Sequence, residues 1–255
     1  MPGKSAWNSL LGSKPPRLLV SVRNVEEAAV AIRGGCDILD VKEPHRGSLG
    51  MATPIVLQQI AEWMRAQAPH ILLSAALGEV HEYQSPRSLS ELPTIFPDLD
   101  FVKLGCANLA TTRSWQQALR ETRAAISPRL TPGTEWVAVA YADWESAAAP
   151  SPDEVISEAL GAGCRGVLID TYAKSGRGLL DWIPADELER YATRLHAENL
   201  FFALAGSLRR DDLPQLKAVS ADIVAIRGAA CLDGVRTDSI HETAIREFRS
   251  ALHKP

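Results

Sequence analysis

The sequence predicts a single α/β domain with the (β/α)₈ barrel (TIM barrel) fold, and three observations indicate it. Short runs of apolar and β-branched residues alternate with longer amphipathic runs along the chain. There are eight such short runs in 255 residues, which matches the strand number and the size of this barrel. The short runs are apolar almost throughout, as in the strands of a parallel sheet that helices cover.

The expected strands recur at similar intervals along the chain. They are residues 17–22, 37–42, 71–77, 100–105, 135–142, 166–172, 200–206 and 222–228. The helix candidates between them are residues 24–35, 53–67, 112–126, 151–163, 185–199 and 210–220. The connection at 78–98 is rich in proline and irregular, so no helix is assigned there.

Local signals support several of the helix ends. Four residues can cap the start of a helix with an oxygen of their side chain, namely Asn24, Thr53, Ser151 and Asp186. Proline follows two of them, in the first helical position that it favours. Glycines at 34–35 and at 161–163 are typical of helix ends.

A doubly wound open sheet is the alternative fold. It is disfavoured because no G-x-G-x-x-G motif follows the first expected strand. The barrel is expected over residues 17–255, after an N-terminal extension at 1–16. Repetition beyond the βα unit and low-complexity tracts are both lacking in the sequence.

Composition points to small molecules as ligands. The net charge is −4, the isoelectric point is about 5.9, and lysine and arginine are scattered rather than clustered. This pattern gives no electrostatic footprint for nucleic acid or for an anionic membrane. The N-terminus has no apolar run of secretory length, and no segment approaches the roughly 20 apolar residues of a membrane span. We therefore expect a cytoplasmic protein, and a closed homo-oligomer, since most soluble assemblies are of that kind.

The cysteines do not indicate a zinc site or a disulfide framework. Cys36, Cys106, Cys164 and Cys231 lie far apart and form no C-x-x-C pair. They are expected to be reduced thiols in the core. Glu79 and Glu82 lack a third ligand at a suitable spacing, so no metal is expected.

Charged residues interrupt the apolar strands near their carboxyl ends, where this barrel builds its active site. In the run DILDVK, the period of two places Asp40 and Lys42 on one face with Ile38. The full set of candidate catalytic residues is Asp40, Lys42, Lys103, Asp143, Asp170 and Lys174. His45, in the loop that follows Lys42, is either a proton shuttle or a surface residue.

Each lysine alone is commonly a rim residue or half of an ion pair, so the set carries the prediction. Lys42 and Lys103 interrupt apolar strands, where burial of an unpaired charge is costly. An ordinary lysine is neutral in only about 1 molecule in 2,500 at pH 7. Burial and neighbouring cations lower the lysine pKa, and the neutral amine then attacks carbonyl groups.

A phosphate site is predicted after the last two strands. Gly206 and Ser207 follow one strand, and Arg227 and Gly228 follow the next. Small residues expose backbone N–H groups, and serine and arginine add donors for phosphate. The alternative is a pair of ordinary tight turns. The loop at 46–50 (RGSLG) offers a second anion site or a lid.

The motifs together resemble the (5-formylfuran-3-yl)methyl phosphate synthase family, also called 4-(hydroxymethyl)-2-furancarboxaldehyde-phosphate synthase. The similarity runs from about Arg17 to the C-terminal helix. The segments that carry it are DVK-x-P-x-x-GSLG, LLSAALGEV, DFVKLG, VAVAYAD, VLIDTYAKSG, FFALAGSL and DIVAIRGAAC. Two departures are the N-terminal extension and Glu43, where the family pattern has a smaller polar residue.

The resemblance implies a (β/α)₈ lyase of methanofuran biosynthesis, found in organisms with methanogenic or tetrahydromethanopterin-linked C1 metabolism. Such enzymes condense two molecules of glyceraldehyde 3-phosphate into a phosphorylated furan, with loss of phosphate and water and without a cofactor. It also implies that Lys42 forms a Schiff base and that Lys103 accepts a proton. Asp40, Asp170 and Lys174 match other polar positions of the family's site.

Two other functions remain open from the residues themselves. One is a Schiff-base aldolase that uses the same lysines on another phosphorylated sugar. The other is a non-catalytic barrel that senses a phosphorylated metabolite, for which the anion site alone would suffice. Borohydride reduction in the presence of triose phosphate separates enzyme from sensor, because only an imine is trapped on lysine.

Overall fold

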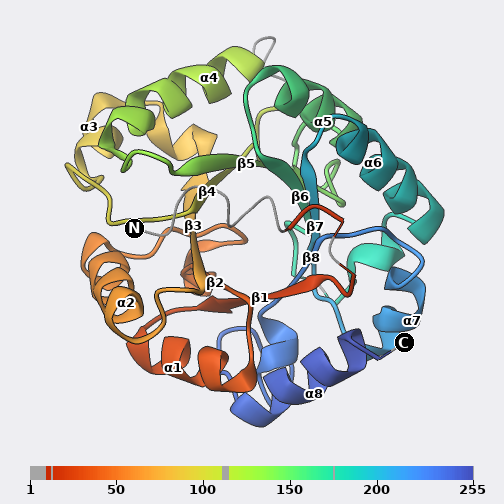
Figure 1. Ribbon diagram of the computed structural model, residues 1–255. Helices are drawn as coiled ribbons and strands as arrows, with labels where there is room; N and C mark the ends of the chain where they lie inside the picture. Colours follow the sequence, from red (N-terminus) through yellow and green to blue (C-terminus); the bar gives the residue numbers. More distant parts are fainter. Residues whose placement is uncertain (1–9, 13, 111–114, 175, 255) are drawn as a thin grey trace.

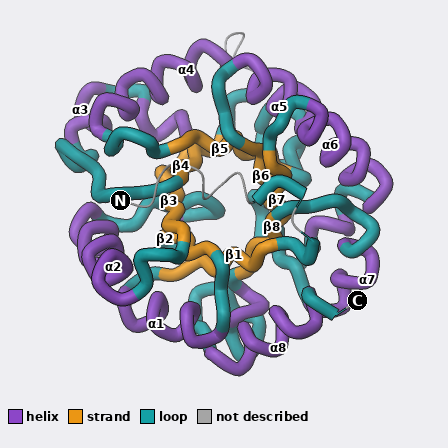
Figure 2. Tube along the Cα trace, in the orientation of Figure 1, coloured by secondary structure: helices purple, strands orange, loops and turns teal. Residues whose placement is uncertain are grey.

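Eight parallel strands close into one barrel within the residues that the computed structural model describes, which are 10–12, 14–110, 115–174 and 176–254. The strands are β1 (Arg17–Val22), β2 (Ile38–Val41), β3 (Leu72–Glu79), β4 (Phe101–Gly105), β5 (Glu135–Tyr141), β6 (Gly166–Asp170), β7 (Phe201–Leu204) and β8 (Ile223–Ile226). Each strand pairs with the next in the chain, and β8 pairs with β1 to complete the ring in Figure 2. The predicted fold class is thus confirmed.

Helices surround the strands as an outer ring (Figure 1). They are α1 (Val25–Gly34), α2 (Pro54–Gln67), α3 (Pro86–Ser90), α4 (Trp115–Ile126), α5 (Pro152–Gly161), α6 (Ala185–Ala197), α7 (Leu213–Leu216) and α8 (Glu242–Leu252). Short 3₁₀ turns are η2 (Pro44–Arg46), η3 (Val80–Tyr83), η4 (Ser127–Arg129), η5 (Leu179–Asp181), η6 (Arg210–Asp212) and η7 (Gly228–Ala230). Among the described residues, no helix has the length and apolar character needed to cross a membrane.

Most expected helix ends are confirmed by their caps. The side chains of Asn24, Thr53 and Ser151 accept backbone N–H groups at the starts of α1, α2 and α5. The prediction for Asp186 was wrong, because α6 begins at Ala185 after the extended Pro184. Asp186 lies in the first turn instead, where its charge complements the helix dipole.

Two connections differ from the expected pattern. The segment predicted as a helix at 210–220 consists of η6 and the single turn α7, and Pro214 lies at the start of that turn. The irregular connection at 78–98 forms η3 and the short α3. The start of the predicted helix at 112–126 lies partly outside the described residues, and α4 is described from Trp115 onward.

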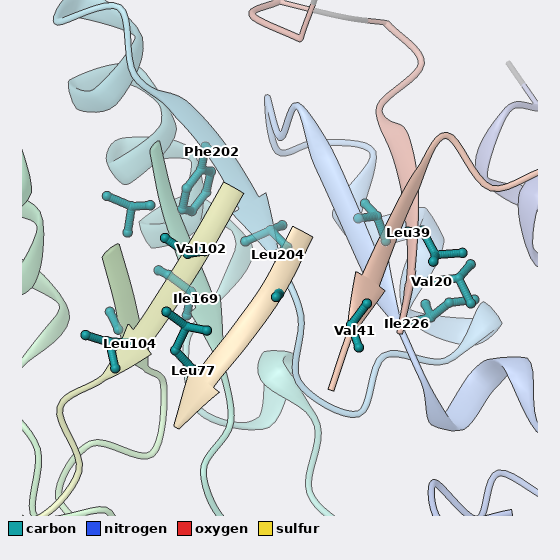
Figure 3. Close-up of a cluster of buried hydrophobic side chains, with 14 of the residues drawn as sticks. Val20, Leu39, Val41, Leu77, Val102, Leu104, Ile169, Phe202, Leu204 and Ile226 are labelled. Carbon is teal, nitrogen blue, oxygen red and sulfur yellow. The ribbon is translucent and has the colours of Figure 1, made fainter. Parts of the chain in front are cut away.

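Alternate side chains of the strands pack into two apolar clusters. One set points outward against the helices, as Figure 3 shows for Val20, Leu39, Val102 and Phe202. The other set fills the interior of the barrel, where the rings of Phe101 and Phe201 meet edge to face with centroids 5.4 Å apart. This arrangement explains why the strands read as apolar on both faces.

Part of the expected N-terminal extension belongs to the barrel core. Leu10 is only 2% exposed and packs in the interior cluster. The backbone N–H of Gly12 donates to a carboxylate oxygen of Asp222 at 2.6 Å, and Asp222 directly precedes β8. The described residues before Arg17 therefore cover the end of the barrel at which the strands begin.

Replacing Leu10 with alanine is expected to destabilise the protein. The substitution leaves a cavity in the interior cluster, which costs about 2–5 kcal/mol of unfolding free energy for a buried leucine. Denaturant unfolding measures the loss. Leu232→Ala, at a leucine that is 66% exposed, is the matched control and should change the free energy by less than about 0.5 kcal/mol. Equal effects of the two substitutions would mean that Leu10 does not contribute to the core.

Candidate active site

The charged residues of β2, β4 and β6 lie inside the barrel near the carboxyl ends of these strands. Asp40 alternates with the outward-facing Leu39 and Val41, so it shares the inner face with Ile38. Lys42 follows β2 directly and is 8% exposed. The apolar interior cluster lies below these charges, which are therefore largely shielded from water.

Lys103 on β4 and Asp40 on β2 form a buried ion pair inside the barrel, with only β3 between their strands. The Lys103 Nζ atom lies 2.5 Å from Asp40 Oδ1, and the two side chains are 4% and 3% exposed. The hydroxyl of Ser21 donates to the second carboxylate oxygen at 3.1 Å. Removal of either charged partner would leave an unpaired charge in the interior.

Asp170 lies between two lysines. Its Oδ1 atom accepts a hydrogen bond from Lys174 Nζ at 2.9 Å, and its Oδ2 atom is 4.0 Å from Lys42 Nζ. Ser48 links the loop after β2 to this centre, because its hydroxyl lies 2.9 Å from the carbonyl of Thr171 and 3.2 Å from Asp170 Oδ2. The predicted residues Lys42, Asp170 and Lys174 thus meet at one place.

The environment of Lys42 favours its neutral amine. Burial is the main cause and, together with the nearby charge of Lys174, lowers the pKa of Lys42 to about 8 against the opposing attraction of Asp170. For Asp170, burial alone would raise the pKa, but Lys174 and Lys42 outweigh it and lower the pKa to about 2. The site therefore holds an ionised carboxylate beside a lysine that loses its proton near pH 8, well below the range of an ordinary lysine.

Asp143 positions a loop with both of its oxygens. They accept the backbone N–H groups of Tyr172 and Ala173 at 2.6 and 2.7 Å, and the side chain is buried. These residues precede Lys174. The carboxylate of Asp143 therefore holds the backbone that carries Lys174, rather than reaching the ion pairs directly.

The turn after β7 keeps the features expected of an anion site. Gly206 and Ser207 have φ angles of 107° and 51°, both in the left-handed region. A Cβ atom on Gly206 would lie 2.9 Å from the Thr171 side chain, so only glycine fits there without rearrangement. Among the described residues, no acceptor is found for the backbone N–H groups of Gly206 and Ser207. Gly228 opens η7 in the loop that follows β8.

Arg227 differs from our expectation of a phosphate ligand. Its guanidinium uses all five N–H groups on the protein: two bind the carboxylate of Glu27, and three bind the carbonyls of Ser21, Arg236 and Asp238. The side chain is 5% exposed. Arg227 is therefore a buried residue that holds the surrounding backbone and Glu27 in place. None of its N–H groups is left to bind phosphate.

The sequence analysis missed a buried phenol–carboxyl pair at the ends of β5 and β3, which alternate around the ring with β2, β4 and β6. The hydroxyl of Tyr141 donates to Glu79, whose other oxygen accepts the N–H of Ala107 at 2.9 Å. Burial is the main cause that raises the pKa of both Glu79 and Tyr141. Val137, Val139 and Tyr141 alternate along one strand and all face the interior. This period of two in the sequence could have predicted that Tyr141 points into the barrel.

The remaining candidates lie around this centre. His45 and Arg46 are exposed in η2, and the guanidinium of Arg46 lies 3.4 Å from the carbonyl of Met51. Gly47 is exposed, and Gly50 packs closely against the backbone of Glu43. Within the described residues, no group of three His, Cys, Asp or Glu side chains could hold a metal ion.

Comparison with known proteins gives consistent matches along almost the whole chain. A family model described as 4-HFC-P synthase matches residues 18–249. The (5-formylfuran-3-yl)methyl phosphate synthase of Methanobrevibacter smithii is 37% identical over 235 residues, which cover 91% of this chain and 97% of that protein. The protein of the same name from Methanothermobacter thermautotrophicus is 35% identical, with 92% and 98% of the two chains covered.

Solved structures share the fold at low sequence identity. Thiamine phosphate pyrophosphorylase from Pyrococcus furiosus has a TM-score of 0.58 at 14% identity, over 94% of this chain and 96% of that one. The 3-hexulose-6-phosphate synthase from Salmonella typhimurium has a TM-score of 0.53 at 15% identity, over 93% and 100%. At these identities the similarity supports the barrel fold alone.

Proposed function

The chain belongs to the 4-HFC-P synthase family, and on that premise we propose that it condenses two molecules of glyceraldehyde 3-phosphate into (5-formylfuran-3-yl)methyl phosphate through a Schiff base on Lys42. The observation that carries this proposal is the buried Lys42, whose pKa is lowered to about 8 beside Asp170 and Lys174. A neutral amine at the end of a barrel strand is suited to attack a carbonyl carbon.

In the first step, the amine of Lys42 adds to the carbonyl of one triose phosphate, and water leaves to give a protonated imine. The imine withdraws electrons and acidifies the adjacent carbon. A carboxylate of the site, or Lys103 after it has passed its own proton to Asp40, then removes a proton from that carbon to give an enamine.

In the second step, the enamine attacks the aldehyde carbon of the second triose phosphate and forms a carbon–carbon bond, which restores the protonated imine. Water then hydrolyses this imine and frees the amine of Lys42. Asp170 and Lys174 are hydrogen-bonded to each other, so a proton can pass between them during ring closure and loss of water and phosphate. The N–H groups of Gly206 and Ser207, which have no acceptor among the described residues, are proposed to hold the phosphate that the product retains, together with Gly228 after β8. The product would serve methanofuran biosynthesis, as the names of the relatives suggest.

The test is to incubate the purified protein with glyceraldehyde 3-phosphate alone. Inorganic phosphate and the near-ultraviolet absorbance of a conjugated furan aldehyde are followed together. A parallel rise that Lys42→Ala abolishes supports the proposed function. If neither signal rises while the protein remains folded, the substrate assignment fails, and a Schiff-base aldolase that acts on another phosphorylated sugar becomes the better hypothesis.

The rate is expected to increase with pH up to about pH 8. The amine of Lys42 attacks only when it is neutral, and below its pKa the protonated form dominates, so about a tenth of the protein is competent at pH 7. Measurement of kcat/KM from about pH 6 to about pH 10 should show a rising limb that levels off near pH 8. A value of kcat/KM that is constant or falls over the lower half of this range would contradict the role of a neutral Lys42.

A further inference from the structure

Arg236 links the loop after β8 to the loop after β2. Its Nη2 atom donates to the carbonyl of Gly47 at 2.8 Å. Gly47 precedes Ser48, which is hydrogen-bonded to Asp170. In the ring of strands, β1 alone separates β8 from β2, so the side chain of Arg236 links two loops that lie on either side of β1.

The backbone that carries Arg236 is held by two other arginines. Arg227 donates to the first and third carbonyls of residues 236–238, at 2.9 and 2.7 Å, and Arg23 donates to the middle one at 2.5 Å. Both arginines are ion-paired with Glu27 on α1, whose side chain is 6% exposed. A loop fixed through three successive carbonyls presents its side chain in one place at little entropic cost.

The guanidinium of Arg236 keeps unused donors. Apart from the bond to Gly47, its N–H groups have no acceptor and make no ion pair among the described residues. The side chain is half-buried, and burial lowers its pKa, although Asp170 and Glu43 attract the charge from a distance. A partly desolvated guanidinium without a bonded anion is costly, and an oxyanion that accepts two of its N–H groups would offset this cost.

We propose that Arg236 binds the phosphate of the second phosphorylated substrate. The assignment rests on the proposed function, in which two triose phosphates bring two phosphates to one mouth. Gly206 and Ser207 lie after β7, whereas Arg236 lies between β8 and β2, so the two anion sites occupy different sectors of the ring. Arg227 and Arg23 act as positioning residues for this second site through their common partner Glu27.

The experiment measures binding of a hexitol 1,6-bisphosphate, which carries two phosphates at the ends of a six-carbon chain. Arg236→Gln should weaken its binding by about tenfold or more, as expected for the loss of charge-assisted hydrogen bonds. Arg236→Lys, which keeps the charge but not the planar fork, should weaken it by about threefold. Arg65→Gln, at an exposed arginine on α2, is the matched control and should leave the affinity unchanged.

Calorimetry gives the affinities, and thermal unfolding checks each variant. Unchanged affinity of a folded Arg236→Gln variant would overturn the proposal and leave Arg236 as a structural link to Gly47 only. If Arg236→Gln does not fold, Arg236→Lys decides in the same way.

Failure of the proposed reaction gives a different result. If the wild-type protein makes no furan, but Arg236→Gln still binds the bisphosphate more weakly than the wild type, the proposed reaction is refuted and the anion site is retained. In a wild type that does make the furan, Arg236→Gln should also raise KM more than it lowers kcat.

Discussion

Replacement of Lys42 with arginine should lower the turnover of glyceraldehyde 3-phosphate by a factor of about 10³ or more. Arginine keeps the positive charge near Asp170, so the electrostatic balance of the buried site changes little. Its guanidinium stays protonated at any pH at which the protein is folded and cannot form an imine. The loss of activity would therefore report on the covalent role of Lys42 rather than on its charge.

Phosphate release and furan absorbance give the rate, and circular dichroism confirms the fold of the variant. Lys217→Arg is the control, because Lys217 is exposed at the end of α7 and takes no part in the ion pairs described for the site. It should retain the wild-type rate within about twofold. Retention of more than a tenth of the rate by Lys42→Arg would exclude the imine mechanism.

The second large effect is expected from Asp170→Asn. The substitution keeps the shape of the side chain but removes the negative charge between Lys42 and Lys174, so the two lysines face each other without compensation. Activity should fall by about 10²-fold or more, because Asp170 handles protons in the proposed reaction. Loss of one member of a buried ion pair also destabilises a fold by about 3–5 kcal/mol.

The pH profile separates this electrostatic role from simple damage to the structure. Asp170 raises the pKa of Lys42, so its loss should lower that pKa below about 8 and move the rising limb of the residual activity to lower pH. Asp98→Asn, at a carboxylate that is 70% exposed, is the control for both measurements. A limb that stays in place or moves to higher pH would contradict the arrangement of charges described here.

The fold was predictable because each strand is a short run of apolar residues that can be recognised in the sequence on its own. Strands that face the interior on one side and helices on the other are apolar throughout, and eight such runs leave little choice of architecture. The period of two also placed Asp40, Lys42 and Asp170 on inner faces. Their convergence on one mouth follows from the closed parallel barrel.

Pairing between distant residues could not be predicted in the same way. The sequence around Arg227 does not distinguish a side chain that binds a ligand from one that binds the buried Glu27. Glu27 lies 200 residues away in an ordinary amphipathic helix. The partners of Asp143 are backbone N–H groups, which leave no mark on the sequence. Leu10 precedes the first strand without a periodic pattern, so its burial depends on closure of the barrel.

The measurement that tests the central claim most directly is borohydride reduction of the protein in the presence of glyceraldehyde 3-phosphate, followed by mass analysis of its peptides. The proposed mechanism predicts a reduced triose phosphate adduct on the peptide that contains Lys42, and none in Lys42→Ala. An adduct confined to Lys103 or Lys174, or no adduct at all in a folded and active protein, would contradict a Schiff base on Lys42.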